Sequence, residues 1–397
     1  MSVGAGQGVK VIACLFSILF LGVADNQTLS PLLPAIRAQL GKSSHEMGFL
    51  FTGYSVCAGL SVLAWGPLSD FFGRKRGLTT GLCVFALGSA ISSLAFTYAW
   101  LLAGRVVTGI GASMLSLNVL SYAADFFPYK IRGRAMAWIV SSYFAALIFG
   151  VPIGAWIGDK LGWNAVFRVA ALTAILLFLW TRWLLAEPFV PAVSDRHTGL
   201  QIVKPFKNYV DFLKTKRTFG ALLSSFFASG GTIGFLAFLG IWLHDAFGIA
   251  GRQIGLVFLA SGTAALLASP IAGLLSDRIG KRFQFILSNA ALALLLLILP
   301  GLRWGHWLFL VFGAVSLAAA FRQGPMEALL TEVAPPAVRG SFVALKNSFS
   351  QLGIGLAAMA SGILFERDGY LAVCLLCAAS NLVAAGSMAV LVRERHL

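Results

Sequence analysis

Long runs of apolar residues, separated by short polar stretches, follow one another along the whole chain. A bilayer core of about 30 Å requires roughly 20 apolar residues in helical conformation. Two sets of six runs reach about this length. The first set covers residues 11–33, 47–67, 77–97, 98–124, 135–158 and 165–186. The second set covers residues 219–243, 253–275, 283–302, 306–330, 341–364 and 370–391. The pattern predicts an all-α membrane protein with twelve transmembrane helices in two pseudo-symmetric six-helix bundles.

The composition agrees with a lipid environment. Hydrophobic residues make up 58% of the 397 residues and charged residues only 11%, which leaves too little polar surface to cover a soluble globule of this size. The first run is too long for a signal-peptide core and lacks a cleavage site, so we expect it to stay in the mature protein. All five cysteines lie inside predicted helices, and the five histidines lack metal-ligand spacing. We therefore expect no metal and no cofactor, with a proton gradient as the energy source.

The positive charge gathers in alternate connections. The net charge is +15, but clusters at 74–76, 130–134 and 278–282 all follow every second predicted span, which argues against nucleic acid as a partner. By the positive-inside rule these connections face the cytoplasm. We expect a multi-pass protein of the bacterial plasma (inner) membrane, with both termini cytoplasmic and membrane lipid as a partner.

The chain contains an internal repeat. The segment Gly66–Arg76 returns as Gly273–Arg282, 207 positions later, each time directly after a long apolar run. At the same offset Asp159 matches Glu366 and Gly162 matches Gly369. One copy is a weak signal, but two copies in register indicate a duplicated membrane protein.

A polar stretch separates the two halves and predicts three parts: a first bundle (1–186), a cytoplasmic linker (187–218) and a second bundle (219–397). Within the linker, Val203, Phe206, Val210 and Leu213 recur at helical spacing opposite several lysines. This favours an amphipathic helix on anionic lipid. A solvated linker without membrane contact is the alternative.

The pattern G-x-L-S-D-x-x-G-R-K-R at Gly66–Arg76 resembles the cytoplasmic signature of the major facilitator superfamily, whose members have two six-helix halves. The resemblance extends over essentially the whole chain. Residues 101–112, around Arg105, look like the fourth-helix Arg motif of the proton-coupled members. Residues 25–36 look like the first-helix pattern common among drug exporters. The resemblance implies an exporter.

The fifth predicted helix departs from the exporter pattern. Exporters usually carry G-P-x-x-G-G there, whereas this chain has Gly150-Val151-Pro152-Ile153-Gly154-Ala155. That variant is similar to sugar and drug efflux relatives. The resemblance also implies a cytoplasmic clamp in which Asp70, near the start of the eleventh helix, holds the two halves together. The residues of this gate motif are Gly66, Asp70, Gly73, Arg74, Asp125, Arg132, Asp277 and Arg339.

Two opposite charges fall at one depth in the first half. Counting about 1.5 Å per helical residue, Asp25 lies roughly 21 Å from the cytoplasmic start of its helix and Arg105 roughly 10 Å from the external start of its own. Intramembrane charges are costly and usually functional. A pair of Asp25 and Arg105 facing a central cavity, with protonation of the carboxylate releasing the guanidinium, would couple transport to protons. A permanent structural ion pair, or an Asp25 wetted at the external mouth, is the alternative.

The second half has its own charges. The repeat places Leu115, Leu120 and Ile139 opposite Arg322, Glu327 and Lys346, so these polar groups are specific to this half. We expect Glu327 and Lys346 to form an inner-gate ion pair and Arg322 to bind an anionic substrate group. Side chains that only extend to the cytoplasmic interface are the alternative.

Aromatic and amide residues complete the predicted cavity, although periodicity does not decide which of them face inward. They are Asn26, Gln27, Tyr54, Asn118, Tyr122, Tyr143, Phe226, Phe227, Gln323, Asn347 and Gln351.

These features predict a monomeric secondary transporter that exports a small organic or amphipathic molecule in exchange for protons. The chain has no phosphate-binding loop of the G-x-x-x-x-G-K-[ST] kind, so we expect no ATP hydrolysis and no enzyme activity. Two alternatives remain: a transporter of an anionic metabolite or lipid that uses Arg105, Arg322 and Lys346 as counter-charges, and a non-transporting membrane receptor or scaffold on the same fold.

Overall fold

The computed structural model describes residues 5–187, 200–335 and 338–392. In the first half the elements are α1 (Ala5–Leu40), α2 (Ser44–Phe72), α3 (Arg74–Ser93), α4 (Tyr98–Phe126), α5 (Tyr129–Val140), α6 (Ser142–Ala145), the π-helical turn η1 (Ala146–Gly150), α7 (Val151–Leu161) and α8 (Trp163–Leu184). After the short helix α9 (Leu200–Lys214), the second half contains α10 (Lys216–Phe247), α11 (Gly251–Ile279), α12 (Lys281–Ile298), the 3₁₀ turn η2 (Leu299–Gly301), α13 (His306–Val333) and α14 (Arg339–Leu391).

The helices account for twelve spans. Within the described ranges, 10 helical segments are long and apolar enough to cross a membrane. One of them, the 53-residue α14, holds two spans because Gly369 (φ 75°) interrupts its helical backbone. The 20-residue α3, rich in small and hydroxyl-bearing residues, supplies the twelfth. The predicted all-α fold of twelve transmembrane helices is confirmed.

The fifth span is less regular than its sequence pattern predicts. Instead of one helix over 135–158, the chain runs through α5, α6, η1 and α7. Pro152, the second residue of α7, has no N–H to donate to a carbonyl in the preceding turn, which explains a change of helical pitch at this point.

Positive-φ glycines repeat in the same register as the sequence. Three pairs lie 207 positions apart: Gly41 and Gly248 (φ 60° and 67°), Gly73 and Gly280 (97° and 89°), and Gly162 and Gly369 (82° and 75°). Each pair joins successive helices at equivalent places in the two halves. Because glycine adopts such angles without steric cost, the duplication extends to the backbone of the turns.

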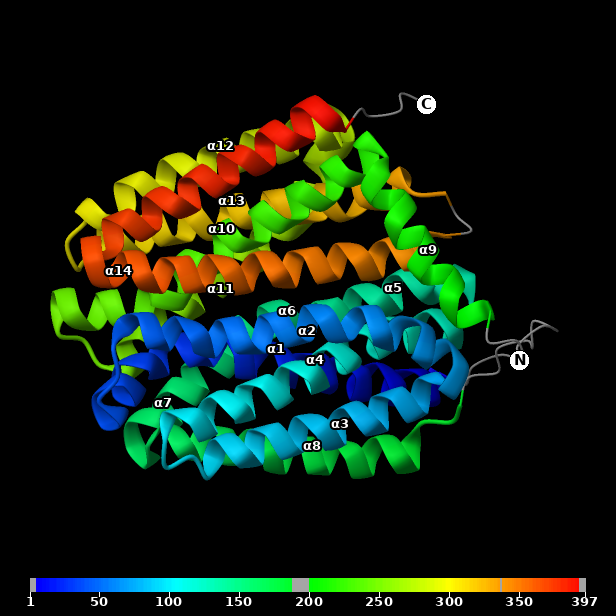
Figure 1. The fold of residues 1–397 in the computed structure, drawn as a ribbon, viewed down its shortest axis with the longest axis horizontal. Coiled ribbons are helices and arrows are strands. Elements are labelled where there is room, and N and C mark those ends of the chain that lie inside the picture. The colour runs from blue at the N-terminus through cyan, green and yellow to red at the C-terminus, as the bar shows by residue number, and fades with distance from the viewer. Residues whose placement is uncertain (1–4, 188–199, 336–337, 393–397) are drawn as a thin grey trace.

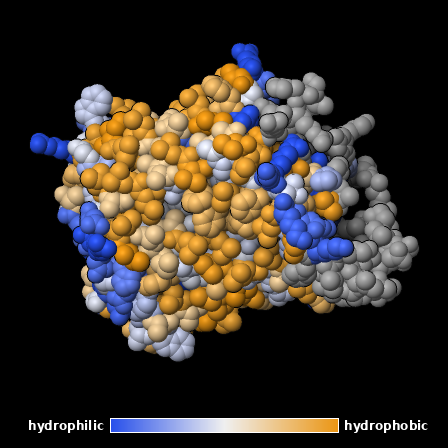
Figure 2. All heavy atoms as spheres, turned by 45° about the horizontal axis from the view of Figure 1, so that its top comes forward, coloured by the Kyte–Doolittle hydropathy of each residue, from blue (hydrophilic) through white to orange (hydrophobic). Residues whose placement is uncertain are grey.

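The helices lie roughly side by side in two groups, one for each half (Figure 1). We call the end of the molecule that carries both chain ends and α9 the termini end, and the opposite end, with the α1–α2 and α10–α11 connections, the turn end. Apolar side chains cover the middle of the face shown in Figure 2, and hydrophilic side chains gather toward its two ends. This distribution fits a protein surrounded by lipid.

One buried cluster joins the halves near the turn end. It includes Leu33 and Ile36 from α1 together with Leu239 and Leu243 from α10. Two other clusters lie largely within one half each. The apolar contact between the halves is therefore concentrated toward the turn end.

The predicted linker helix is present as α9. Tyr209 and Phe212 are buried against the second half, whereas Val210 and Leu213 are exposed. The side chains of Val203 and Phe206 lie outside the described residues. Contact of α9 with the bilayer surface stays a prediction.

Candidate functional site

Asp25 on α1 and Arg105 on α4 form an ion pair inside the first half. Nη1 of Arg105 donates to Oδ2 of Asp25 at 2.7 Å. The side chain of Arg105 is 0% exposed and that of Asp25 is 1% exposed. The sequence predicted that these two residues lie at the same depth, and the structure places them in contact.

Aromatic rings enclose the guanidinium of Arg105. Its Cζ lies 4.8 Å from the ring centroid of Tyr54 on α2 and 5.5 Å from that of Phe167 on α8. Nε and Nη2 are buried and have no hydrogen-bond partner among the described residues. The arginine thus makes one strong polar bond, and that bond is to Asp25.

This arrangement links the charge of Asp25 to the position of Arg105. A buried ion pair is held together by mutual attraction in a medium of low dielectric, and removal of one charge leaves the other uncompensated. A proton bound to Asp25 would leave the guanidinium with aromatic faces and no counter-ion. The pair is therefore chemically suited to couple proton binding with movement of α4 against α1.

Glu327 on α13 and Lys346 on α14 form the second intramembrane pair. Nζ of Lys346 donates to Oε1 of Glu327 at 2.7 Å. The lysine side chain is 9% exposed, whereas the glutamate side chain is 54% exposed. The carboxylate therefore lies at an accessible surface within the span and retains room for another partner.

Arg322 on α13 is buried without a carboxylate partner among the described residues. Its Nη1 donates to the carbonyl oxygen of Ala228 at 2.7 Å and to Oδ1 of Asn381 at 3.2 Å. Asn381 is held in turn by Gly231 and Cys377, whose carbonyl oxygens accept from its amide. The residue is 8% exposed, and its Nε has no partner within the part of the chain that the structure describes. The second half therefore contains a positive charge that neutral oxygens only partly compensate.

Several other predicted cavity residues occupy partly accessible positions. Tyr143 and Gln323 are exposed, although both belong to spans. Phe226 and Phe227 pack edge to face, with centroids 5.1 Å apart. Two more, Asn26 and Gln351, each have a buried side-chain oxygen that finds no partner among the residues described. Gln27 and Asn347 are half-buried.

The structure places Asn118 and Tyr122 elsewhere than predicted. Asn118 lies directly against Gly77 of α3 and donates to Met114. Tyr122 donates its hydroxyl hydrogen to the carbonyl of Ala186 at 2.7 Å and belongs to the core of the first half. These residues are one helical turn apart on the face of α4 that packs inside its own bundle. They stabilise that bundle and do not line a cavity between the halves.

The gate-motif residues form bonds mainly within the first half. Nε of Arg74 lies 3.1 Å from Oδ2 of Asp125, and Nε of Arg132 donates to the carbonyl of Phe127. Asp277 and Arg339 are exposed at the termini end.

The two glycines of the first motif copy lie in different settings, Gly73 at a turn and Gly66 inside α2. Gly73 ends α2 with φ 97°, and a Cβ on Gly66 would come no closer than 3.8 Å to the Cβ of Ala344 in the second half. The side chain of Asp70 lies outside the described residues, so its clamp across the halves stays a prediction.

The two halves are joined at the turn end. Nη2 of Arg37 lies 2.6 Å from Oδ1 of Asp245, and Oγ of Ser30 donates to the carbonyl of Leu236 at 2.6 Å. Gly240 packs so closely that a Cβ there would overlap the carbonyl oxygen of Ser30.

Away from the turn end, α2 still contacts α14: Oγ1 of Thr52 donates to the carbonyl of Gly355 at 2.8 Å, and a Cβ on Gly59 would lie 3.1 Å from the carbonyl oxygen of Ser348. The ion pair and hydrogen bonds at the turn end, together with the half-exposed Glu327, favour a conformation that is closed at the turn end and accessible from the termini end.

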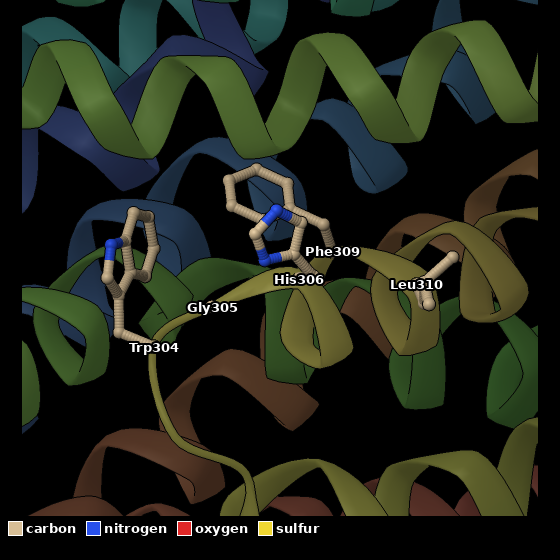
Figure 3. Close-up of a pocket in the computed structure, with 5 residues that line it drawn as sticks. All are labelled: Trp304, Gly305, His306, Phe309 and Leu310. Atoms are coloured by element: carbon tan, nitrogen blue, oxygen red, sulfur yellow. The ribbon is translucent and has the colours of Figure 1, made fainter.

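A hollow on the outer surface has a different character. It is lined by Trp304, Gly305, His306, Phe309 and Leu310. Figure 3 shows the rings of Trp304, His306 and Phe309 grouped along the connection that leads into α13. Its lining is apolar and includes none of the intramembrane charges, so it is not the candidate site.

Some partners of the candidate residues were not predicted. Phe167, Ala228 and Asn381 complete the surroundings of the two arginines. No motif marks a backbone carbonyl or an aromatic contact, so only the packing identifies them. Asp159 and Glu366 were matched by the repeat, but their contacts were not foreseen.

Comparison with known proteins gives one family. The model of the Major Facilitator Superfamily matches residues 15–242 and again residues 221–396. The chain is 28% identical over 380 residues to the uncharacterised MFS-type transporter YwfA of Bacillus subtilis, covering 91% of this chain and 87% of that protein. It is 28% identical over 377 residues to the bacillibactin exporter of the same organism, covering 88% of each.

The solved structures agree on the fold. The crystal structure of a D-xylose–proton symporter superposes with a TM-score of 0.78 at 18% identity, covering 98% of this chain and 99% of that one. The repeated family match corresponds to the two halves of the helical architecture. The chain belongs to the major facilitator superfamily and is a multi-pass membrane transporter, not an enzyme.

Proposed function

We propose that this transporter exports a small organic or amphipathic molecule in exchange for protons. The observation that carries the proposal is the buried pair of Asp25 and Arg105, whose charges compensate each other at 2.7 Å. Such a pair responds to a proton because the neutral carboxyl no longer holds the guanidinium. The bacillibactin exporter, 28% identical, supports the direction of transport.

The positive-inside rule assigns the termini end to the cytoplasm. The conformation described above is then open to the cytoplasm and closed to the outside. A monomer in the bacterial plasma membrane is sufficient for this function, since both halves of the transport path belong to one chain.

The transport cycle follows from this orientation. Substrate enters the space between the halves from the cytoplasm, next to the half-exposed carboxylate of Glu327. When the halves rock to the opposite conformation, the substrate leaves and Asp25 is reached by protons from outside. Protonation of Asp25 frees Arg105, and return to the described conformation delivers the proton to the cytoplasm, where the pair reforms.

Transport into proteoliposomes tests the proposal. Purified protein is reconstituted with a fluorescent pH indicator inside, and bacillibactin and a panel of amphipathic dyes are offered under an imposed pH gradient. We expect substrate movement coupled to opposite proton movement, and loss of both in Asp25→Asn. The control Asp368→Asn removes an exposed carboxylate near the turn end. Gradient-independent transport, or normal coupling in Asp25→Asn, contradicts proton exchange at this site.

Arg322 supports a second candidate, a facilitator of an anionic molecule. Among the described residues its guanidinium has two neutral acceptors and an Nε without a partner, and buried charges usually have an opposite charge nearby. An anionic substrate group would supply it. This candidate predicts transport without a pH gradient, abolished in Arg322→Gln and retained in Asp25→Asn.

A further inference from the structure

Two carboxylates at the turn end each reach from one half of the molecule to the other. Oδ2 of Asp159, on α7 of the first half, accepts from the backbone N–H of Arg252 at 2.7 Å. Oε2 of Glu366, on α14 of the second half, accepts from the backbone N–H of His45 at 3.1 Å. The first contact joins the first half to α11, and the second joins the second half to α2.

These two contacts are equivalent under the internal repeat. Asp159 and Glu366 are 207 positions apart, and so are His45 and Arg252. Each accepted N–H belongs to the second residue of its helix, since α2 begins at Ser44 and α11 at Gly251. Each half therefore supplies one carboxylate that accepts from a helix start of the other half.

The chemistry of the contact favours a carboxylate. The first N–H groups of a helix have no partner within that helix, and the helix dipole places partial positive charge there. The imidazole of His45 lies next to the same carboxylate, with its Nδ1 3.6 Å from Oε2 of Glu366.

The packing beneath the two contacts is also equivalent. A Cβ on Gly48 would lie 2.7 Å from the carbonyl oxygen of Ala358, and one on Gly255 would lie 3.1 Å from the Cβ of Ala155. These glycines are again 207 positions apart. Close approach of α2 to α14 and of α11 to α7 brings each carboxylate within reach of its helix start.

We propose that Asp159 and Glu366 form a reciprocal latch that holds the turn end closed. Each carboxylate caps a helix of the opposite half, so separation of the halves at this end breaks both bonds together. Neither bond survives a rocking motion that opens the turn end. The latch thus sets the balance between the two conformations independently of the substrate and of Asp25.

Distance measurements between the halves test the latch. Phe96 and Arg303 are exposed at the turn end, one in each half, and serve as spin-label positions after replacement by cysteine in a background without the native cysteines. Electron–electron double resonance in lipid then gives the populations of closed and open molecules. No substrate is needed, so the result is separate from that of the transport assay.

We expect Asp159→Ala and Glu366→Ala, which remove the accepting side chain, each to raise the open-to-closed ratio roughly fivefold, the usual effect of losing a side-chain acceptor at a helix start, and the double variant to raise it further. The matched control is Glu46→Ala. Glu46 accepts from Ser43 at the start of the same helix α2, but from within the same half, so its loss should leave the distances unchanged.

Two outcomes overturn the latch. One is an unchanged distance distribution in the double variant, even if its melting temperature falls, because the carboxylates would then only stabilise local structure. The other is an equal shift in Glu46→Ala, because any weakening of the helix start would then suffice. Both target carboxylates are exposed, so the variants should fold.

Discussion

Neutralising Asp25 should destabilise the protein far more than its single hydrogen bond suggests. Asp25→Asn keeps the shape of the side chain but leaves Arg105 buried, between two aromatic rings and without a counter-charge. Breaking a buried ion pair by removing one partner costs about 3–5 kcal/mol. For a chain of this size we expect a fall in melting temperature of roughly 5 °C or more.

Neutralising Arg105 as well should restore much of the stability that Asp25→Asn loses. In the double variant Asp25→Asn/Arg105→Gln no uncompensated charge remains, and replacing a whole buried pair by neutral groups is often close to neutral. Loss of the contacts with Tyr54 and Phe167 leaves a residual cost of about 1–2 kcal/mol. The double-mutant cycle should therefore give a coupling energy of at least about 2 kcal/mol.

The pair of Arg37 and Asp245 provides the matched control. Its two atoms are 2.6 Å apart, but the side chains are 25% and 39% exposed. Solvent screening limits such a pair to about 1 kcal/mol or less. The same cycle at Arg37 and Asp245 should give a much smaller coupling energy, although the distance is similar.

Thermal unfolding followed with a thiol-reactive dye measures these effects, because Cys14, Cys374 and Cys377 are free and buried and react once the protein opens. If Asp25→Asn is as stable as the wild type, or if the double variant is no more stable than the single one, the pair is not energetically coupled. The expected magnitude also bears on function: a proton motive force of roughly 150 mV supplies about 3.5 kcal/mol per proton, enough to open such a pair.

Two further substitutions probe other contacts. Gly240→Ala places a Cβ against the carbonyl of Ser30, so it should separate the halves at the turn end and lengthen the spin-label distances. Gly386→Ala, with nothing within 4 Å of the added Cβ, should leave these distances unchanged. Glu327→Gln leaves Lys346 without its carboxylate partner. Because Glu327 is half-exposed, we expect the free energy of unfolding to fall by only about 1 kcal/mol in the same assay. A fall as large as that of Asp25→Asn would contradict this expectation.

The fold was predictable because the repeat and the apolar runs carry independent information. Runs of about 20 residues identify spans, and the 207-residue offset shows which span of the first half is equivalent to which span of the second. The turn at Gly162 could be matched with that at Gly369, although their positive φ angles could not be read from the sequence. The π-helical turn before Pro152 was not predicted, because proline signals a break without specifying the pitch that replaces it.

The site was predictable where depth alone decides contact. Asp25 and Arg105 were paired by counting residues along two helices, and the count was sufficient because both side chains point into the bundle. Asn118 and Tyr122 were assigned to the cavity by residue type alone and lie elsewhere, because hydropathy in a membrane helix does not distinguish a face toward neighbouring helices from a face toward a cavity.

The contacts between the halves were harder to foresee. Asp159 and Glu366 were visible as matched acidic residues, but their partners are backbone N–H groups of the other half, which carry no sequence signal. Arg322 was singled out as a charge without an equivalent in the first half. Its acceptors, the carbonyl of Ala228 and the amide of Asn381, follow only from packing.

The most direct measurement asks whether Asp25 itself takes up a proton. Infrared difference spectra of the wild type in lipid, recorded as the pH is lowered, report the carbonyl stretch of a newly protonated carboxyl group. If Asp25 is the coupling site, this band appears in the wild type and is missing from Asp25→Asn, while Asp368→Asn retains it. Identical spectra for the wild type and Asp25→Asn would contradict proton coupling at this pair.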